Sequence, residues 1–232
     1  MSELLKLTDV AKTFTLHNQG GSVLPVFEGA SFSVFGGECV ALSGPSGMGK
    51  STLLRMIYAN YLCSRGSIEV RHRGAMVDIA SADARTVLDI RRWSLGYISQ
   101  FLRVVPRVGA LDVVAEPLIH RGIDDGTARQ RAGEMLARLN LPERLWSLAP
   151  ATFSGGEQQR INIARGFAAD FPVMLLDEPT ASLDRENREC VLTLIREAKS
   201  SGVALIGIFH DADTRAAVCD REIEIASFRA AA

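Results

Sequence analysis

Short apolar runs alternate with stretches of helical spacing along much of this chain. The runs at 38–42, 173–176 and 203–209 are almost continuously apolar, a pattern typical of strands buried in a parallel sheet. Apolar residues recur at helical spacing in 51–57 and in about 184–200. This order of elements predicts an α/β fold with a mixed or parallel sheet core.

Two pairs of strands are predicted outside that core. Residues 4–8 and 23–34 flank a polar turn, and 66–70 and 75–79 flank a basic one. We expect the first pair to form an antiparallel flap with Phe14 between its strands. The basic run at 71–73 is expected to be solvated.

A strand predicted at 94–100 ends at Gln100, and the pattern then becomes helical. From residue 101 to about 165, apolar residues follow helical spacing in 110–120 and in 127–140. This stretch is predicted to be a helical insertion. The chain is therefore expected to be one domain, residues 1–232, in which 1–100 and 166–232 form the core and about 101–165 the helical subdomain.

Composition narrows the class of protein. The 232 residues are 47% hydrophobic, enough for a large core, and 26 basic residues against 27 acidic ones give a net charge of −1. That balance gives no reason to expect nucleic acid as the main partner. The four cysteines lack metal-ligand spacing, so free thiols in a reducing compartment are expected. Since no apolar stretch approaches the length of a membrane helix, we expect a cytoplasmic protein.

A glycine-rich loop lies between the strand at 38–42 and the helix at 51–57. Its sequence matches the phosphate-binding pattern G-x-x-x-x-G-K-[ST] at every fixed position. Glycines let backbone N–H groups approach a triphosphate, and the start of a helix adds its positive dipole end. Lys50 can reach the β- and γ-phosphates, and Ser51 can bind Mg²⁺. The candidate nucleotide-binding residues here are Gly44, Pro45, Ser46, Gly47, Gly49, Lys50, Ser51 and Thr52.

A second candidate phosphate site begins at Ser154. Ser154 with Glu157 three residues later forms the pattern of a capping box, which alone would explain a helix start. It does not explain Gly155 and Gly156, which leave the positively polarised helix end bare. We therefore expect this end to contact a phosphate.

Acidic and imidazole side chains end two of the apolar strands. Asp177 and Glu178 follow the run at 173–176, and His210 follows the run at 203–209. Ligands of parallel α/β sheets collect at the carboxyl ends of the strands. Asp177 suits a Mg²⁺ held mostly through water beside Ser51, and Glu178 suits the group that orients an attacking water.

Together these motifs resemble the ATP-binding-cassette (ABC) ATPases from residue 4 to about 225. The resemblance implies a P-loop NTPase with a RecA-like core, MgATP as ligand, and a head-to-tail dimer with a second cassette, identical or different. By the same resemblance, Phe14 stacks on adenine, Gln100 links Mg²⁺ to the helical insertion, and His210 is the switch histidine. Residues 154–158 resemble the signature motif and 182–184 the D-loop. Lys50, Gln100, Glu178 and His210 are the implied catalytic residues.

The local sequences at 57–61 and 96–108 resemble those of cassette subunits from bacterial carbon–phosphorus lyase systems. That resemblance implies a carbon–phosphorus lyase core complex as partner and a role in phosphonate use. The alternative is a subunit that energises a membrane transporter, closest to lipoprotein- or peptide-exporting cassettes. A third possibility is a non-hydrolysing scaffold, which intact Glu178 and His210 argue against. In each case the partner surface is expected near 101–117.

Overall fold

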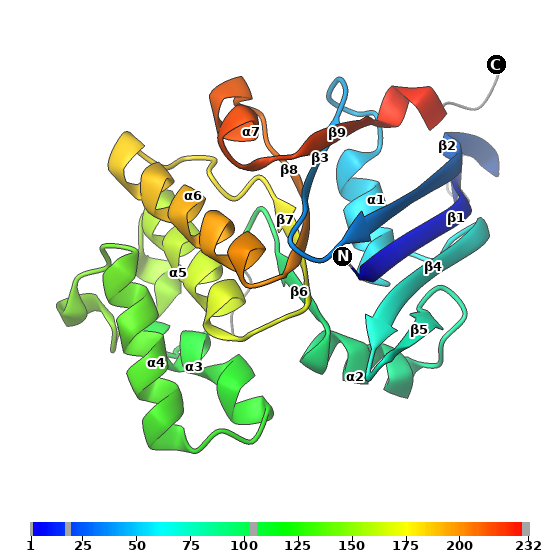
Figure 1. The fold of residues 1–232 in the computed structure, drawn as a ribbon. Helices are drawn as coiled ribbons and strands as arrows, with labels where there is room; N and C mark the ends of the chain where they lie inside the picture. The colour runs from blue at the N-terminus through cyan, green and yellow to red at the C-terminus, as the bar shows by residue number, and fades with distance from the viewer. Residues whose placement is uncertain (1, 17–19, 103–105, 229–232) are drawn as a thin grey trace.

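The computed structural model describes residues 2–16, 20–102 and 106–228. Figure 1 shows two sheets packed beside a group of helices. The antiparallel sheet has the order β2-β1-β4-β5 and the parallel sheet the order β6-β7-β8-β3-β9. The strands are β1 (Glu3–Leu16), β2 (Ser22–Phe35), β3 (Cys39–Ser43), β4 (Arg65–His72), β5 (Ala75–Asp78), β6 (Leu95–Ile98), β7 (Val173–Asp177), β8 (Ala204–Ile208) and β9 (Arg221–Glu224).

Helices cover the parallel sheet and form the insertion. Figure 1 places α3, α4 and α5 together on the opposite side of the parallel sheet from the antiparallel one. The helices are α1 (Lys50–Ile57), α2 (Ala84–Trp93), α3 (Ala110–His120), α4 (Asp125–Arg138), α5 (Gly155–Ala168), α6 (Arg185–Ser200) and α7 (Ala212–Val218). Short 3-10 helices lie at Glu143–Leu145, Pro150–Thr152 and Ile225–Phe228.

The parallel sheet is buried on both faces, as the continuous apolar runs in the sequence predict. Every residue of β7 and of β8 is buried, so continuous apolar sequence is needed on both faces. One apolar cluster joins the flap, α1 and one face of the sheet, while a second joins the other face to α3, α4, α5 and α6. The predicted α/β fold with an antiparallel flap and a helical insertion is confirmed.

Two details differ from the sequence predictions. β1 runs to Leu16, so Phe14 lies within the strand, opposite Leu24 of β2, and not between two strands. His72 is not solvated but 8% exposed, because its ring nitrogens reach Ser94 Oγ at 2.7 Å and Asp89 Oδ2 at 3.0 Å. The division expected near residue 165 lies within the range of α5, Gly155–Ala168, and stays a prediction.

Within the described ranges, no helix is long and apolar enough to span a membrane. All four cysteines are free, as the sequence predicts. Cys39 and Cys219 nevertheless lie close together, with 3.8 Å between their sulfur atoms. They meet because β9 pairs with β3 and brings the segment before it alongside Cys39.

Candidate functional site

The phosphate loop joins the end of β3 to the start of α1. Gly49 precedes the helix with φ of 93°, and a Cβ there would lie 2.5 Å from Val26 Cγ1, so the position requires glycine. Among the described residues, no side chain caps α1. Its first N–H groups are therefore available to an anion.

Lys50 folds back over the loop. Its Nζ donates to the carbonyl oxygens of Gly44 at 2.6 Å and Pro45 at 2.9 Å. No ion pair of Lys50 occurs in the part of the chain that the structure describes. Neutral carbonyl oxygens thus hold the Lys50 ammonium group beside the loop, and its positive charge remains available for an ion pair with a phosphate.

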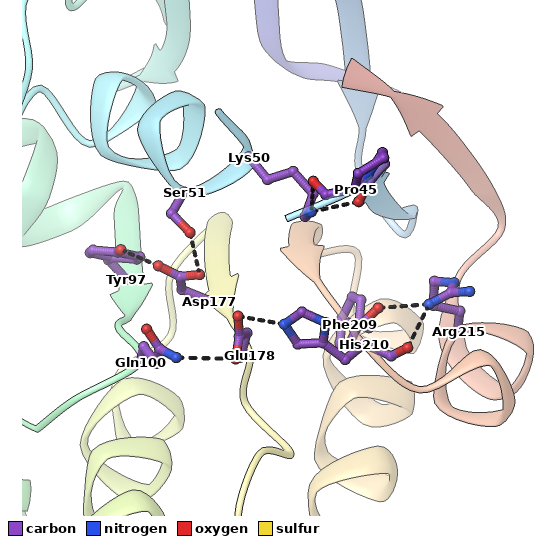
Figure 2. Close-up of polar contacts among 11 residues, drawn as sticks. Pro45, Lys50, Ser51, Tyr97, Gln100, Asp177, Glu178, Phe209, His210 and Arg215 are labelled. Atoms are coloured by element: carbon purple, nitrogen blue, oxygen red, sulfur yellow. Dashed lines mark hydrogen bonds and ion pairs between the residues drawn. The ribbon is translucent and has the colours of Figure 1, made fainter. Parts of the chain in front are cut away.

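Asp177 lies at the end of β7 between two hydroxyl groups (Figure 2). Ser51 Oγ donates to Asp177 Oδ1 at 3.2 Å, and Tyr97 Oη donates to Asp177 Oδ2 at 3.0 Å. Burial raises the pKa of Asp177, although these two hydrogen bonds oppose the shift. Burial likewise raises the pKa of Tyr97, so its hydroxyl keeps its proton.

Glu178 forms the centre of a second polar group (Figure 2). Gln100 Nε2 donates to Glu178 Oε2 at 3.2 Å, while His210 Nε2 lies 2.6 Å from Glu178 Oε1. Glu178 has φ of 56° and Ser182 has φ of 63°, unusual values for residues with a side chain. The turn after β7 therefore adopts a strained conformation that points the carboxylate toward Gln100 and His210.

The N-terminus of α5 is capped by side chains of the same segment. Glu157 N donates to Ser154 Oγ, and Ser154 N donates to Glu157 Oε2, which completes the predicted capping box. Hydrogen bonds from Ser154 lower the pKa of Glu157. Among the described residues, no heavy atom beyond the chain neighbours and the helix's own backbone lies within 4 Å of a Cβ built on Gly155, whereas one on Gly156 would meet Ser182 O at 3.2 Å. Gly155 therefore faces open space.

The oxygen donors around Asp177 fit a Mg²⁺ ion. Mg²⁺ prefers oxygen ligands and keeps several waters, so one carboxylate and one hydroxyl beside a bound phosphate are sufficient. Asp177 and Ser51 already lie in hydrogen-bonding contact, and the Gln100 side chain lies on the neighbouring Glu178. The residues present thus fit the ion that the sequence predicts.

A family model described as "ABC transporter" matches residues 27–181 of this chain. The chain belongs to the ABC transporter family. Its sequence is 40% identical over 209 residues to the lipoprotein-releasing system ATP-binding protein LolD of Maricaulis maris (strain MCS10), covering 90% of this chain and 88% of that protein. It is 34% identical over 225 residues to the macrolide export ATP-binding/permease protein MacB of Escherichia coli (strain K12). That match covers 97% of this chain but 33% of MacB.

Solved structures agree with this assignment. The dimeric post-hydrolysis state of the ATP-binding cassette MJ0796, bound to ADP and Pi, superposes with a TM-score of 0.86 at 29% identity. The match covers 95% of this chain and 94% of that one. This ABC domain is accordingly an ATPase that uses ATP with Mg²⁺. The expected partnership with a carbon–phosphorus lyase complex gains no support, since the relatives described above are transport proteins.

The ABC site brings together most of the side chains that the sequence singles out. Ser51 and Asp177 form one contact group, and Gln100, Glu178 and His210 form another. Phe14 lies on the flap with its ring edge-on to Tyr61 at 5.6 Å, so its role toward adenine stays a prediction. Among the described residues, no hydrogen bond joins the start of α5 to the phosphate loop.

Sequence reasoning missed two residues that hold this ABC site. Tyr97 binds Asp177, and Arg215 donates from Nη1 to the carbonyl oxygens of Phe209 at 2.8 Å and His210 at 3.1 Å. Strand alternation could have placed Tyr97 on one face of β6, but not beside Asp177. Arg215 gives no signal because its contacts depend on how α7 packs.

Proposed function

We propose that this chain is the ATP-hydrolysing subunit of a membrane transporter of the lipoprotein-releasing or exporter type. The observation that carries the proposal is its 40% identity to LolD across 90% of the chain. The match to MacB, an export protein with its own permease part, points to the same class. The lipoprotein-releasing type is favoured because its identity is higher.

The proposed hydrolysis uses the two contact groups at the strand ends. Glu178 orients and polarises the attacking water. His210 Nε2, 2.6 Å from Glu178 Oε1, fixes that carboxylate, and His210 would contact the γ-phosphate when ATP is bound. Lys50 and the N–H groups of α1 bind the phosphates. Ser51, Asp177 and Gln100 would hold Mg²⁺, which when bound offsets the negative charge of the β- and γ-phosphates.

We further propose that two copies, or this chain and a second cassette, close head to tail around ATP. The start of α5 is the part that a partner would use, because Gly155 faces open space and, among the described residues, no hydrogen bond joins this helix start to the phosphate loop of its own chain. The relative MJ0796 is dimeric in its ADP- and Pi-bound structure. Hydrolysis would then remove a contact between subunits and let the dimer open.

A groove between α2, β6, α3 and α5 is the proposed contact for the membrane partner. It has a volume of about 490 Å³, and its lining includes Leu88, Pro117 and Phe171. Leu88 is 64% exposed and lies beside other apolar lining residues, so it offers apolar surface to a partner. Tyr97 lines both this groove and the neighbouring hollow at Gln100 and Asp177. The groove extends the surface expected near 101–117, of which residues 103–105 lie outside the described residues.

The test is co-purification from native cells with ATP, Mg²⁺ and the tagged Glu178→Gln chain. We expect an integral membrane protein to be recovered only after detergent extraction. Leu88→Glu should abolish its recovery by placing a charge in the groove. Leu62→Glu is the matched control, since Leu62 is 75% exposed and does not line the groove.

Each other outcome overturns part of the proposal. Recovery of phosphonate-degrading enzymes without detergent would favour the carbon–phosphorus lyase partnership. Equal loss of the membrane protein with both leucine variants would show that the groove is not the contact. Reconstitution with the recovered partner then tests the substrate, because a lipoprotein-releasing system should show lipoprotein-stimulated ATP hydrolysis.

A further inference from the structure

Asp177 depends on two residues for its orientation, and only one belongs to the phosphate loop. Ser51, which follows Lys50 in the phosphate-loop motif, holds Oδ1, and Tyr97 holds Oδ2 from the neighbouring strand β6. Asp177 is 1% exposed, so water gives its carboxylate little alternative hydrogen bonding. Without the Tyr97 hydroxyl, one carboxylate oxygen would lose its partner and the group could rotate about χ2.

The Tyr97 ring is itself held in place by packing. Its centroid lies 5.0 Å from that of Tyr58, at the end of α1, with the ring planes tilted by 45°. Arg91 of α2 lies 4.4 Å above the Tyr58 ring and donates to the Tyr58 carbonyl oxygen from Nε at 2.9 Å. Packing against Tyr58 therefore fixes the Tyr97 ring and holds its hydroxyl in place beside Asp177.

We propose that Tyr97 is a positioning residue for magnesium: its hydroxyl fixes the Asp177 carboxylate so that Oδ1 faces the Ser51 side of the site. Phenylalanine in its place keeps the aromatic ring that packs on Tyr58 and removes the hydroxyl, which donates to Asp177 and also contacts Arg55. The effect should then appear in metal-dependent nucleotide binding and not in binding of the nucleotide itself. This inference goes beyond the proposed transport function and does not depend on it.

The experiment measures equilibrium binding of a fluorescent ATP analogue to the purified Glu178→Gln chain, once with excess Mg²⁺ and once with EDTA. The ratio of the two dissociation constants reports how much the metal adds to binding. Tyr97→Phe should reduce that ratio about tenfold or more, the effect of one hydrogen bond to a buried charge. The dissociation constant in EDTA should remain unchanged.

Tyr58→Phe is the matched control, because it also removes a phenol hydroxyl while keeping a ring in the same aromatic pair. Its ratio should equal that of the parent chain, and both variants should melt within a few degrees of it. A spectroscopic check uses Mn²⁺ in place of Mg²⁺, where Tyr97→Phe should broaden the electron paramagnetic resonance lines of the bound ion as the carboxylate becomes less ordered.

Two results would overturn the proposal. An unchanged ratio in Tyr97→Phe would show that Ser51 alone orients Asp177. Equal weakening of binding in Mg²⁺ and in EDTA would show that Tyr97 supports the fold of the whole site, without a specific effect on the metal. Neither result would affect the proposed transporter, which is tested by its membrane partner.

Discussion

Two glycine-rich helix starts, at α1 and at α5, are completed in different ways. Among the described residues, no side chain caps α1, and the side chains beside it, Ser51 and Asp177, lie in hydrogen-bonding contact. The start of α5 is the reverse, since Ser154 and Glu157 cap it within the chain and Gly155 faces open space. The start of α1 therefore has uncapped N–H groups and lies among the site residues. The start of α5 has a complete side-chain cap and makes no hydrogen bond to the other site residues among those described.

This difference suggests separate roles in ATP binding for the start of α1 and the start of α5. Uncapped N–H groups at α1 have to be satisfied, and a phosphate can do so within one subunit. The start of α5 is already capped by its own side chains, so it needs no ligand for stability. It can contact a phosphate that is bound by another subunit. This would make α1 the site of binding and α5 the site that reports binding to a partner. The predictions that follow test this division.

The largest effect should come from Glu178→Gln, which acts on hydrolysis but on neither helix start. Glutamine keeps the size of the side chain but cannot act as a base, so turnover should fall by about 10²-fold or more. ATP should still bind, and a dimer should accumulate with ATP in size-exclusion chromatography. Undiminished steady-state hydrolysis would remove Glu178 from the role assigned to it.

Gly155→Asp addresses the α5 end alone and should lower hydrolysis by about 10²-fold. An acid in the first turn is favourable for a helix, so the melting temperature should be maintained or rise slightly. The new charge would face the phosphate held by the partner subunit and oppose dimer closure. ATP binding to the monomer, measured by fluorescence, should remain intact.

Gly126→Asp is the control for that change. Gly126 lies in the first turn of α4, and among the described residues a Cβ there would meet Asp124 Oδ1, at 3.4 Å, and no other atom within 4 Å. The variant adds the same charge in the first turn of a helix that belongs to neither the phosphate loop nor the start of α5. Hydrolysis that falls equally in both variants would contradict the special role of the α5 end.

His210→Ala should have a smaller effect, lowering turnover about tenfold or more, because it removes the group that holds Glu178 and not the base itself. The affinity for ATP should change little, so the loss should appear in kcat and not in KM. A rise in KM with kcat unchanged would instead place His210 in nucleotide binding.

The smallest effect concerns stability. Burial raises the pKa of Asp177, so folding disfavours its ionised form, and stability falls as pH rises from the unfolded pKa through the folded one. Asp177→Asn removes that cost, and the nucleotide-free variant should melt about 2–4 °C higher at pH 7. The gain should shrink as the pH falls below the raised pKa of the native carboxyl, which then becomes protonated. A lower melting temperature at pH 7 would show that the two hydroxyl contacts outweigh the burial.

The phosphate loop, the capping box and the strand-end acids could be predicted from sequence because each follows from contiguous residues. Lys50 and Ser51 are fixed by the motif, and Asp177 by the strand that it ends. Contacts that depend on packing between distant elements could not be predicted. Tyr97 and Arg215 are of this kind, as is buried His72, whose partners lie on α2 and just after it. The identity of the partner protein also left no contiguous signal, and the finer resemblance of residues 57–61 and 96–108 to carbon–phosphorus lyase cassettes gains no support from the relatives.

The backbone of Glu178 and Ser182 has a consequence for protein engineering. Both residues adopt positive φ, at 56° and 63°, and each such residue costs about 1 kcal/mol or more relative to glycine. A sequence optimised for stability alone would therefore replace them with glycine or asparagine. At position 178, where we propose that the carboxylate orients the attacking water, this would produce a more stable protein with much slower ATP hydrolysis, so a stability-based redesign of this domain has to keep that strain deliberately.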